Sequence, residues 1–361
     1  MKIVTVVGAR PQFVKAAVVS RAASEENITE VIVHTGQHYD TNMSDVFFQE
    51  MQIPKPNYFL GIGGKSHGAL TGQMLEKIEF VLMDEKPDVV LTYGDTDSTL
   101  AGALAAAKLH IPVAHVEAGL RSFNTAMPEE INRILTDRIS RWLFCPTEAA
   151  VQNLLDEGYG NTCRNHHVYN VGDVMYDAAL FYQKIAQPSR TVLDLLDKQS
   201  EFYLATVHRA ENTDNPERLC AIFQALDEIS SHKAVILPLH PRTRKVIAGM
   251  KLPLKNIEVI DPVGYFDMLT LLTHCNAVFT DSGGVQKEAY FFKKLCITLR
   301  DETEWVELVE YGYNALVGAD KVKILDAQAG LASKRFDFST ELYGDGTAGE
   351  KIIQRLVVGL R

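Results

Sequence analysis

The chain has 361 residues, which is more than one hydrophobic core usually supports, so two domains are expected. Its content of 46% hydrophobic and 23% charged residues is ordinary for a globular protein. The net charge of -10 argues against a nucleic-acid partner, because an acidic surface repels the phosphate backbone. A local basic site for an acidic small molecule is still compatible with that charge.

The five cysteines are odd in number, scattered, and without the spacing of metal ligands. Most lie in apolar runs and predict reduced core residues, which fits a reducing cytoplasm. After Met1 and Lys2, only five residues precede Gly8, which predicts a buried strand rather than a signal peptide. No apolar run reaches the roughly 20 residues that cross a bilayer, so no membrane partner is expected.

The first half of the chain alternates apolar strands with helical patterns. Lys2–Val7 is a β-branched run that ends at Gly8-Ala9-Arg10-Pro11, where a helix begins with proline in its first turn. Further strands are predicted at Val31–His34, Asp88–Thr92 and Ile111–Val116, and helices near Met43–Met51 and from Pro128 onward. This alternation predicts a parallel doubly wound sheet, in which ligands bind beyond the carboxyl ends of the strands.

The pattern crosses a boundary near Asn170, and a second alternating series starts at Phe202. Its predicted strands are Phe202–Val207, Ala234–Pro238, Ile257–Ile260, Ala277–Thr280, Cys296–Leu299 and Ala315–Val317. We therefore predict an α/β fold of two Rossmann-like domains facing each other across a cleft. Residues 1–170 form the N-terminal domain and residues 171–345 the C-terminal one. An amphipathic helix within residues 346–361 packs back on the N-terminal domain.

A phosphate-binding turn is predicted where the strand ending at Thr280 meets the next helix, at Asp281-Ser282-Gly283-Gly284. Glycines let backbone amides approach a ligand, and a helix start carries unpaired N–H groups and partial positive charge. Glu288, about one turn into that helix, could reach a ribose hydroxyl. An ordinary strand-to-helix connection with a serine cap is the alternative. Arg10 and Lys15, near the first helix start, either face a bound anion or are surface charges.

Three carboxylates follow the strands of the first half: Asp95, Glu117 and Glu129. Clustered acids raise one another's pKa, so that one holds a proton while another acts as a base. The structural alternative is that Asp95 caps a helix, Glu117 pairs with Arg121, and Glu129 stabilises a helix start.

Two histidines follow strands in the second half. His208 stands beside Arg209, and His240 lies two residues before Arg242. His208 could contact phosphate or assist proton transfer, although a lone histidine is more often structural. Arg242 could supply bidentate phosphate contacts or lie on the surface.

The sequence lacks the motifs of several other kinds of enzyme. There is no nucleophile elbow, P-loop lysine motif or zinc pattern. The turn Gly8-Ala9-Arg10-Pro11 is not the Gly-x-Gly-x-x-Gly fingerprint, so a tightly held dinucleotide is not indicated. No cofactor and no metal are expected.

Taken together, these turns resemble the non-hydrolysing UDP-N-acetylglucosamine 2-epimerase family over roughly residues 3 to 318. The resemblance is carried by Gly8-Ala9-Arg10-Pro11, Gly36-Gln37-His38, Gly94-Asp95-Thr96, His115-Val116-Glu117-Ala118-Gly119-Leu120-Arg121, Pro128-Glu129-Glu130-x-Asn132-Arg133, His208-Arg209-x-Glu211-Asn212, His240-Pro241-Arg242 and Thr280-Asp281-Ser282-Gly283-Gly284-x-Gln286.

The resemblance implies the glycosyltransferase-B architecture and inversion at C2 of a UDP-2-acetamido sugar, by anti elimination and re-addition of UDP. It implies acid, base and ion-stabilising roles for Asp95, Glu117 and Glu129, and a catalytic or phosphate-contacting role for His208. Substrate-binding roles are implied for Arg10, Lys15, His240, Arg242, Ser282, Gly283, Gly284 and Glu288. It also implies a C-terminal UDP-binding domain and a homodimer.

The chain departs from the family pattern at three places. Gln12 and Lys287 replace acids, and Trp305 replaces an arginine. These changes look like the subgroup that converts UDP-2,3-diacetamido-2,3-dideoxy-glucuronate to its manno epimer for surface polysaccharide (O-antigen) synthesis, since a less acidic site suits a substrate with an extra carboxylate. A plain UDP-N-acetylglucosamine 2-epimerase and a glycosyltransferase are the alternatives.

Overall fold

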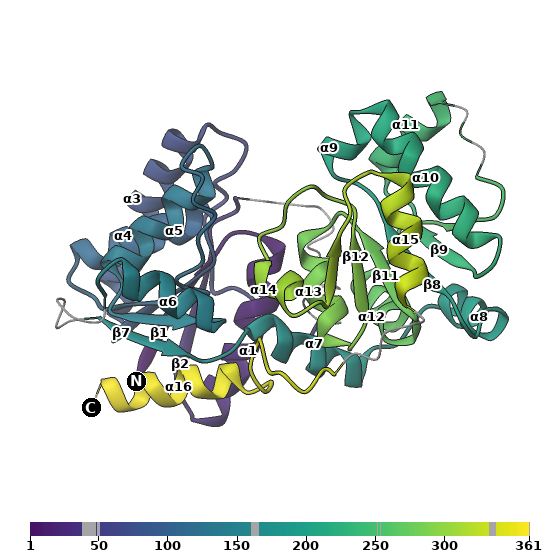
Figure 1. Cartoon of the computed structure of the whole chain (residues 1–361). Coiled ribbons are helices and arrows are strands. Elements are labelled where there is room, and N and C mark those ends of the chain that lie inside the picture. The colour runs from purple at the N-terminus through teal and green to yellow at the C-terminus, as the bar shows by residue number, and fades with distance from the viewer. Residues whose placement is uncertain are drawn as a thin grey trace. The chain divides into compact units, whose positions relative to one another are not determined.

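The computed structural model describes residues 1–37, 48, 51–159, 166–250, 252, 254–331 and 337–360. The chain divides into two α/β units, the first formed by Met1–Leu180 with Glu341–Arg361 and the second by Phe181–Thr340. The limits therefore lie at 180/181 and 340/341, where 170/171 and 345/346 are predicted, and the first of them falls within helix α7 (Val174–Ile185). Figure 1 traces both units.

The first unit is built on a seven-stranded sheet whose paired strands all run parallel, in the order β3-β2-β1-β4-β5-β6-β7. Its strands are β1 (Lys2–Val7), β2 (Thr29–His34), β3 (Tyr58–Phe59), β4 (Val89–Tyr93), β5 (Val113–Val116), β6 (Trp142–Cys145) and β7 (His167–Asn170). The central β1 reads Lys-Ile-Val-Thr-Val-Val and is buried from Ile3 onward. A strand covered on both faces needs such a nearly continuous apolar run.

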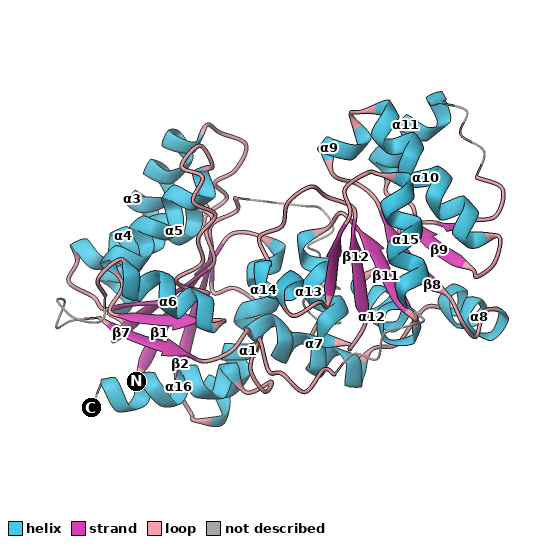
Figure 2. Cartoon of the chain, viewed as in Figure 1, coloured by secondary structure: helices cyan, strands magenta, loops and turns pink. Residues whose placement is uncertain are grey.

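Helices cover both faces of this sheet (Figures 1 and 2). They are α1 (Arg10–Glu25), α3 (His67–Glu85), α4 (Asp97–Lys108), α5 (Pro128–Ile139), α6 (Glu148–Asp156) and α16 (Ala348–Gly359). Met74 and Ile78 of α3 are buried against strand valines such as Val4 and Val33.

The C-terminal helix α16 packs on α1. The fit is tight at Gly349, where a Cβ would lie 2.7 Å from the Cγ1 of Val18. The N–H of Gly349 also donates to Asp177 Oδ2 at 2.9 Å, so a side chain of α7 caps the start of α16.

The second unit contains a six-stranded parallel sheet in the order β10-β9-β8-β11-β12-β13. Its strands are β8 (Tyr203–Thr206), β9 (Val235–Pro238), β10 (Glu258–Ile260), β11 (Ala277–Thr280), β12 (Leu295–Thr298) and β13 (Asn314–Leu316). Its helices are α8 (Arg190–Lys198), α9 (Ala210–Thr213), α10 (Pro216–Ser230), α11 (Pro241–Met250), α12 (Tyr265–His274), α13 (Gly283–Phe291), α14 (Val306–Glu310) and α15 (Lys321–Leu331). Side chains of α10, α11 and α15 fill one core, and those of α8, α12 and α13 fill another.

Every strand that the sequence predicts is present, with its ends within two residues of the predicted ones. Strands β3, β6 and β7 are not among the predictions. The helix predicted near Met43–Met51 lies outside the described residues except for Phe48 and Met51, and Cys163 lies outside them too. Within the described part of the chain, no helix combines the length and apolar character needed to cross a bilayer.

Candidate active site

Two predicted acids of the first unit lie where β4 and β5 end, around Gly94. The φ of Gly94 is +67°, and a Cβ there would lie 3.3 Å from Glu117 Oε2 and 3.6 Å from Lys15 Nζ. The N–H of Gly94 donates to the carbonyl of Val116 at 3.0 Å, which fastens this turn to β5. Glycine is therefore needed both for its backbone conformation and for the close approach of two charged side chains.

Glu117 is held in an unusual conformation and is paired with a cation. Its φ is 74°, in the left-handed region that non-glycine residues enter at a cost of order 1 kcal/mol or more, and such residues cluster at functional sites. Its carboxylate forms an ion pair with Lys15, and both side chains are largely buried. Burial works to lower the pKa of Lys15, but the carboxylates of Glu117, Asp95 and Asp173 outweigh it, so the pKa is raised.

The contacts of Lys15 and Arg121 bear on two predictions for this rim, the anion contact of Lys15 and the pairing of Glu117 with Arg121. Lys15, predicted to contact a bound anion, has its ammonium group against the Glu117 carboxylate. The alternative pairing of Glu117 with Arg121 is wrong. Arg121 instead donates to Asp137 Oδ2 at 2.7 Å and to both oxygens of Glu157.

The start of helix α5 is fastened to the turn that carries Asp95. Arg133 forms ion pairs with Asp95 and, at 2.6 Å, with Glu130. Asn132 Nδ2 donates to the Asp95 carbonyl at 3.0 Å. Glu129 is exposed in the first turn of α5, three and four residues before Asn132 and Arg133, so it lies on the same side of the helix. Asp95 and Glu117 thus share a rim, and Glu129 stands one helical turn from the partners of Asp95.

Gln12, one of the departures from the family pattern, is a structural link between two turns. Its Oε1 accepts the N–H groups of Gly8 (2.7 Å) and Ala9 (3.0 Å). Its Nε2 donates to the Tyr93 carbonyl at 2.6 Å and to the hydroxyls of Thr96 and Thr99 at 3.0 Å. A glutamate has no N–H to donate to the Tyr93 carbonyl. The scaffold therefore accounts for the neutral amide at this position.

In the second unit, the buried carboxylate of Asp281 joins the turn after β11 to the turn after β8. It accepts the backbone N–H groups of His208 and Arg209, each at 3.0 Å, and Nδ2 of Asn212 at 3.1 Å. Hydrogen bonds to a charged acceptor are stronger than neutral ones, so this acid fixes the local backbone. The sequence singles out Ser282 and the glycines of this turn, but not Asp281.

His208 also faces that buried acid. Its Nδ1 lies 3.5 Å from Asp281 Oδ1, and its ring centroid is 5.8 Å from that of His240. Burial lowers the pKa of His208, Asp281 opposes that change, and His240 and Arg209 add to it, so the net shift is downward. His208 is consequently uncharged at neutral pH. Its side chain is partly exposed, and its Nδ1 edge faces Asp281.

The start of helix α13 has the features of an anion site. Ser282 Oγ caps the helix by accepting the Val285 N–H at 3.5 Å. A Cβ on Gly283 would lie 2.1 Å from Glu304 Oε1 and 3.5 Å from Arg209 Nη2, whereas a Cβ on Gly284 would meet nothing within 4 Å. The space beside Gly284 is therefore open, while the Glu304 carboxylate fills the space beside Gly283. A helix start with open space next to an arginine suits a phosphate group.

The remaining predicted binding residues differ in their surroundings. Burial raises the pKa of Glu288 to about 7, with Lys287 opposing it. Arg242 pairs with Asp214 at 2.7 Å in an exposed position. Arg10 is an exposed residue at the start of α1.

Two departures from the family pattern contact each other. The ammonium of Lys287 lies 4.3 Å from the ring centroid of Trp305, and both residues are buried. The indole Nε1 of Trp305 donates to the Gly283 carbonyl at 2.9 Å. Lys287 therefore does not face solvent, and the pair supports the turn that begins α13.

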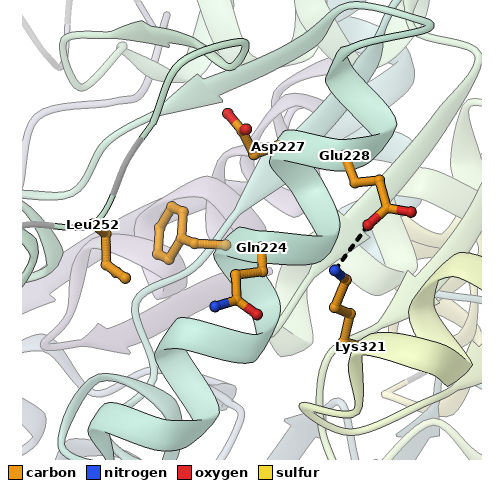
Figure 3. A pocket seen from close by; sticks show the side chains of 6 residues that line it. Gln224, Asp227, Glu228, Leu252 and Lys321 are labelled. Carbon is orange, nitrogen blue, oxygen red and sulfur yellow. Dashed lines mark ion pairs between the residues drawn. The ribbon is translucent and has the colours of Figure 1, made fainter.

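A surface hollow of about 210 Å³ lies elsewhere on the second unit (Figure 3). Its lining includes the ion pair between Glu228 of α10 and Lys321 of α15, at 2.8 Å. None of the predicted site residues lines it. Among the described residues, no group of three or more His, Cys, Asp or Glu side chains is arranged to hold a metal ion.

Comparison with known proteins places this geometry in a class. A family model described as UDP-N-acetylglucosamine 2-epimerase matches residues 21–357. The UDP-2,3-diacetamido-2,3-dideoxy-D-glucuronate 2-epimerase of Pseudomonas aeruginosa is 56% identical over 358 residues, covering 99% of each chain. The solved structure of the UDP-GlcNAc 2-epimerase from Methanocaldococcus jannaschii is 45% identical, covers 99% of this chain and 100% of its own, and has a TM-score of 0.88. The same protein in complex with UDP-GlcNAc and UDP gives a TM-score of 0.83.

Two parallel-sheet α/β units of this kind define an enzyme of glycosyltransferase-B architecture, which confirms the predicted fold class. The chain belongs to the UDP-N-acetylglucosamine 2-epimerase family, and it is a non-hydrolysing UDP-sugar 2-epimerase.

Proposed function

We propose that the enzyme interconverts UDP-2,3-diacetamido-2,3-dideoxy-α-D-glucuronate and its manno epimer, as a step toward a surface polysaccharide. The main support for this substrate is the 56% identity, across 99% of both chains, to the UDP-2,3-diacetamido-2,3-dideoxy-D-glucuronate 2-epimerase of Pseudomonas aeruginosa. Lys287 supports it locally, because a buried ammonium beside Glu288 and the Gly283 turn makes this part of the second unit less acidic. A less acidic site suits a sugar that carries its own carboxylate.

The proposed reaction removes the proton from C2 as the C1–O bond to UDP breaks, with the bond electrons leaving on the diphosphate. A glycal-like intermediate remains. A proton is then added to C2 on the opposite face, and UDP adds back at C1. Atoms and electrons balance without an external oxidant or reductant.

We propose that the first unit supplies the proton transfers through Asp95, Glu117 and Glu129. The carboxylate of Glu117 is paired with Lys15, and that of Asp95 with Arg133, so each lies against a side-chain cation. Those two are suited to act as bases or to stabilise positive charge at the sugar ring. Glu129, exposed at a helix start, is the remaining group of the three. General acid–base catalysis by such groups is typically worth about 10² to 10⁴-fold in rate.

We propose that the second unit binds the UDP portion. The diphosphate would be held by the backbone N–H groups of Gly283 and Gly284 and by the Ser282 cap. Glu288 would accept a hydrogen bond from a ribose hydroxyl. His208, fixed through Asp281, would contact the leaving oxygen, where negative charge develops. Arg10, Lys15, His240 and Arg242 stay predicted substrate contacts, although Lys15 acts first on Glu117 in this arrangement.

A paired-substrate assay tests the substrate. UDP-2,3-diacetamido-glucuronate and UDP-N-acetylglucosamine are incubated separately with the enzyme, and C2 is followed by proton NMR. We expect epimerisation of the carboxylated sugar at a higher kcat/KM. Turnover of the uncharged sugar alone would contradict the proposed substrate. Release of UDP only when an acceptor is added would instead indicate a glycosyltransferase.

We further propose a homodimer formed through the first unit. Phe80 and Met83 on α3 and Ile131 and Leu135 on α5 are exposed apolar side chains in pairs that share a helix face. Sedimentation equilibrium should report twice the 40.2 kDa chain mass, and a monomer at micromolar concentration would contradict this assembly.

A further inference from the structure

A fully buried histidine lies beneath the two acidic turns of the first unit and has no part in the reaction proposed above. His115 sits on β5, two residues before Glu117, with no exposed surface. Its Nε2 lies 2.7 Å from the carbonyl oxygen of Gly94, the residue before Asp95. Its Nδ1 lies 2.6 Å from Asp137 Oδ1 on α5. One imidazole therefore contacts the turn of one acid and belongs to the strand of the other.

The hydrogen-bond partners of His115 define where its protons are. A backbone carbonyl can only accept, so Nε2 carries a hydrogen. Nδ1 and Asp137 Oδ1 then need one proton between them. The second oxygen of Asp137 accepts Nη1 of Arg121 at 2.7 Å and the N–H of Gly119 at 3.1 Å. Asp137 therefore faces N–H donors through its other oxygen and acts there as an acceptor, so the shared proton belongs on Nδ1 and the ring carries two.

The charges around the ring balance in that state. Arg121 pairs with Glu157 through two bonds of 2.6 and 2.8 Å, in addition to its bond to Asp137. Imidazolium and guanidinium together then match the two carboxylates. Burial raises the pKa of the nearby Cys145 thiol well above its usual range, so it adds no charge. Buried charges persist when they are paired and fully hydrogen-bonded, which these are.

We propose that His115 is held as an imidazolium and positions both acidic turns, by fixing the Gly94 carbonyl and by placing a positive charge beneath Asp95 and Glu117. Both backbone polar groups of Gly94 are then bonded to β5, the N–H to the Val116 carbonyl and the carbonyl to His115. The consequence for turnover rests on the proposed function. The charge state and the fixing of the turn do not.

The charge state is read by ¹⁵N NMR of the imidazole rings in the wild-type full-length chain at pH 7, with rings connected to assigned backbone signals. Both nitrogens of His115 should be protonated. His34 is a buried control, because burial lowers its pKa to about 4 and its Nδ1 accepts the Gly36 N–H at 3.0 Å. It should show one bare nitrogen. A bare nitrogen on His115 would overturn the proposal.

The positioning role is read in His115→Gln, with His167→Gln on the edge strand β7 as the matched control. Misplacing a reacting group by about 1 Å costs on the order of 10²-fold, so kcat should fall by about that factor with KM little changed. Its pH–rate profile should also move to higher pH, since the acids lose a neighbouring cation. Hydrogen exchange at the Gly94 amide should accelerate.

A further variant and the same measurements test the role of His115. If His115→Gln does not fold, Asp137→Asn should leave the wild-type ring contacts but release the Nδ1 proton, and retention of that proton would overturn the assignment. A wild-type enzyme that turns over no UDP-sugar would refute the proposed function, while ring protonation and Gly94 exchange would still decide this inference. Unchanged exchange and kcat in His115→Gln would refute the positioning role.

Discussion

The two units present different chemistry at the same place in the same kind of sheet. In the first unit, acids project from the ends of β4 and β5, and each is matched by a side-chain cation, Lys15 for Glu117 and Arg133 for Asp95. In the second, the acid at the corresponding edge is Asp281, which is buried and bonded to backbone N–H groups.

The difference shows how one topology serves two tasks. A carboxylate that reacts has to be exposed to substrate and tuned by its neighbours. A carboxylate that organises a binding turn is better buried, where it fixes amides that then face an anion. The first rim therefore supplies reactive side chains, and the second supplies backbone N–H groups that are held in position.

Replacing the acids of the first rim should have the largest effect on turnover. Turnover should fall by about 10² to 10⁴-fold in Asp95→Asn, Glu117→Gln and Glu129→Gln. Each substitution removes a carboxylate that is proposed to transfer a proton or to stabilise positive charge at the sugar ring. Steady-state kinetics and a thermal unfolding scan would be measured together. Glu217→Gln, an exposed acid in the first turn of α10, is the control and should keep full activity. Near-normal rates in all three would dismiss the assignment.

Asp281→Asn should act on the second rim through stability. The variant amide places an N–H where the turn needs an acceptor, and hydrogen bonds to charged groups are worth about 1.5–3 kcal/mol each in net terms. We expect the free energy of unfolding to fall by about 3 kcal/mol and UDP affinity to fall with it. Urea denaturation and calorimetric titration with UDP would show this. Unchanged affinity would mean that the turn does not bind the nucleotide.

Gly94→Ala tests how closely the first rim is packed. The left-handed φ of +67° costs an alanine about 1–2 kcal/mol, and its Cβ would press on Glu117 at 3.3 Å. A lower midpoint of unfolding and a reduced kcat are expected. Gly249→Ala, in helix α11 with open space around it, should be neutral or stabilising. Equal behaviour of the two variants would refute the close approach.

The Lys287–Trp305 contact can be measured by a double-mutant cycle with Lys287→Met and Trp305→Leu. A cation over an aromatic ring contributes about 0.5–2 kcal/mol, so the coupling in unfolding free energy should fall in that range. Additive single effects would show that the contact carries no energy. If the two variants lose kcat/KM only for the carboxylated sugar, that loss would support the proposed substrate.

The smallest expected effect is a pH dependence from Glu288. Burial raises its pKa to about 7 in the folded chain, above the ordinary value of 4.5, so the folded state binds more protons between those values. The free energy of unfolding should therefore fall as pH rises from about 4.5 to 7. Glu288→Gln should flatten that slope in urea denaturation series, whereas Glu350→Gln, exposed on α16, should leave it intact. A wild-type slope retained in Glu288→Gln would assign it to another group.

The strands can be predicted from the sequence because buried parallel strands are nearly continuous apolar runs such as Ile3–Val7. β7 is less regular, with the polar ends His167 and Asn170, and gave no such signal. Acids at strand ends could be placed on one rim from topology alone.

Their partners could not be predicted. Lys15 and Glu117 are 102 residues apart, and Gln12 and Tyr93 are 81 apart, so no local pattern links them. The contact between Lys287 and Trp305 likewise depends on the folded backbone, because the sequence shows two separate departures from the family pattern and nothing that links them.

The central claim, proton exchange at C2 by the acids of the first unit, is tested most directly by turnover in heavy water. The wild-type enzyme should place deuterium at C2 of both UDP-sugar epimers while the total nucleotide-sugar stays constant, and Glu117→Gln should slow that uptake. Epimerisation without deuterium at C2, or steady loss of the sugar from UDP, would contradict the account.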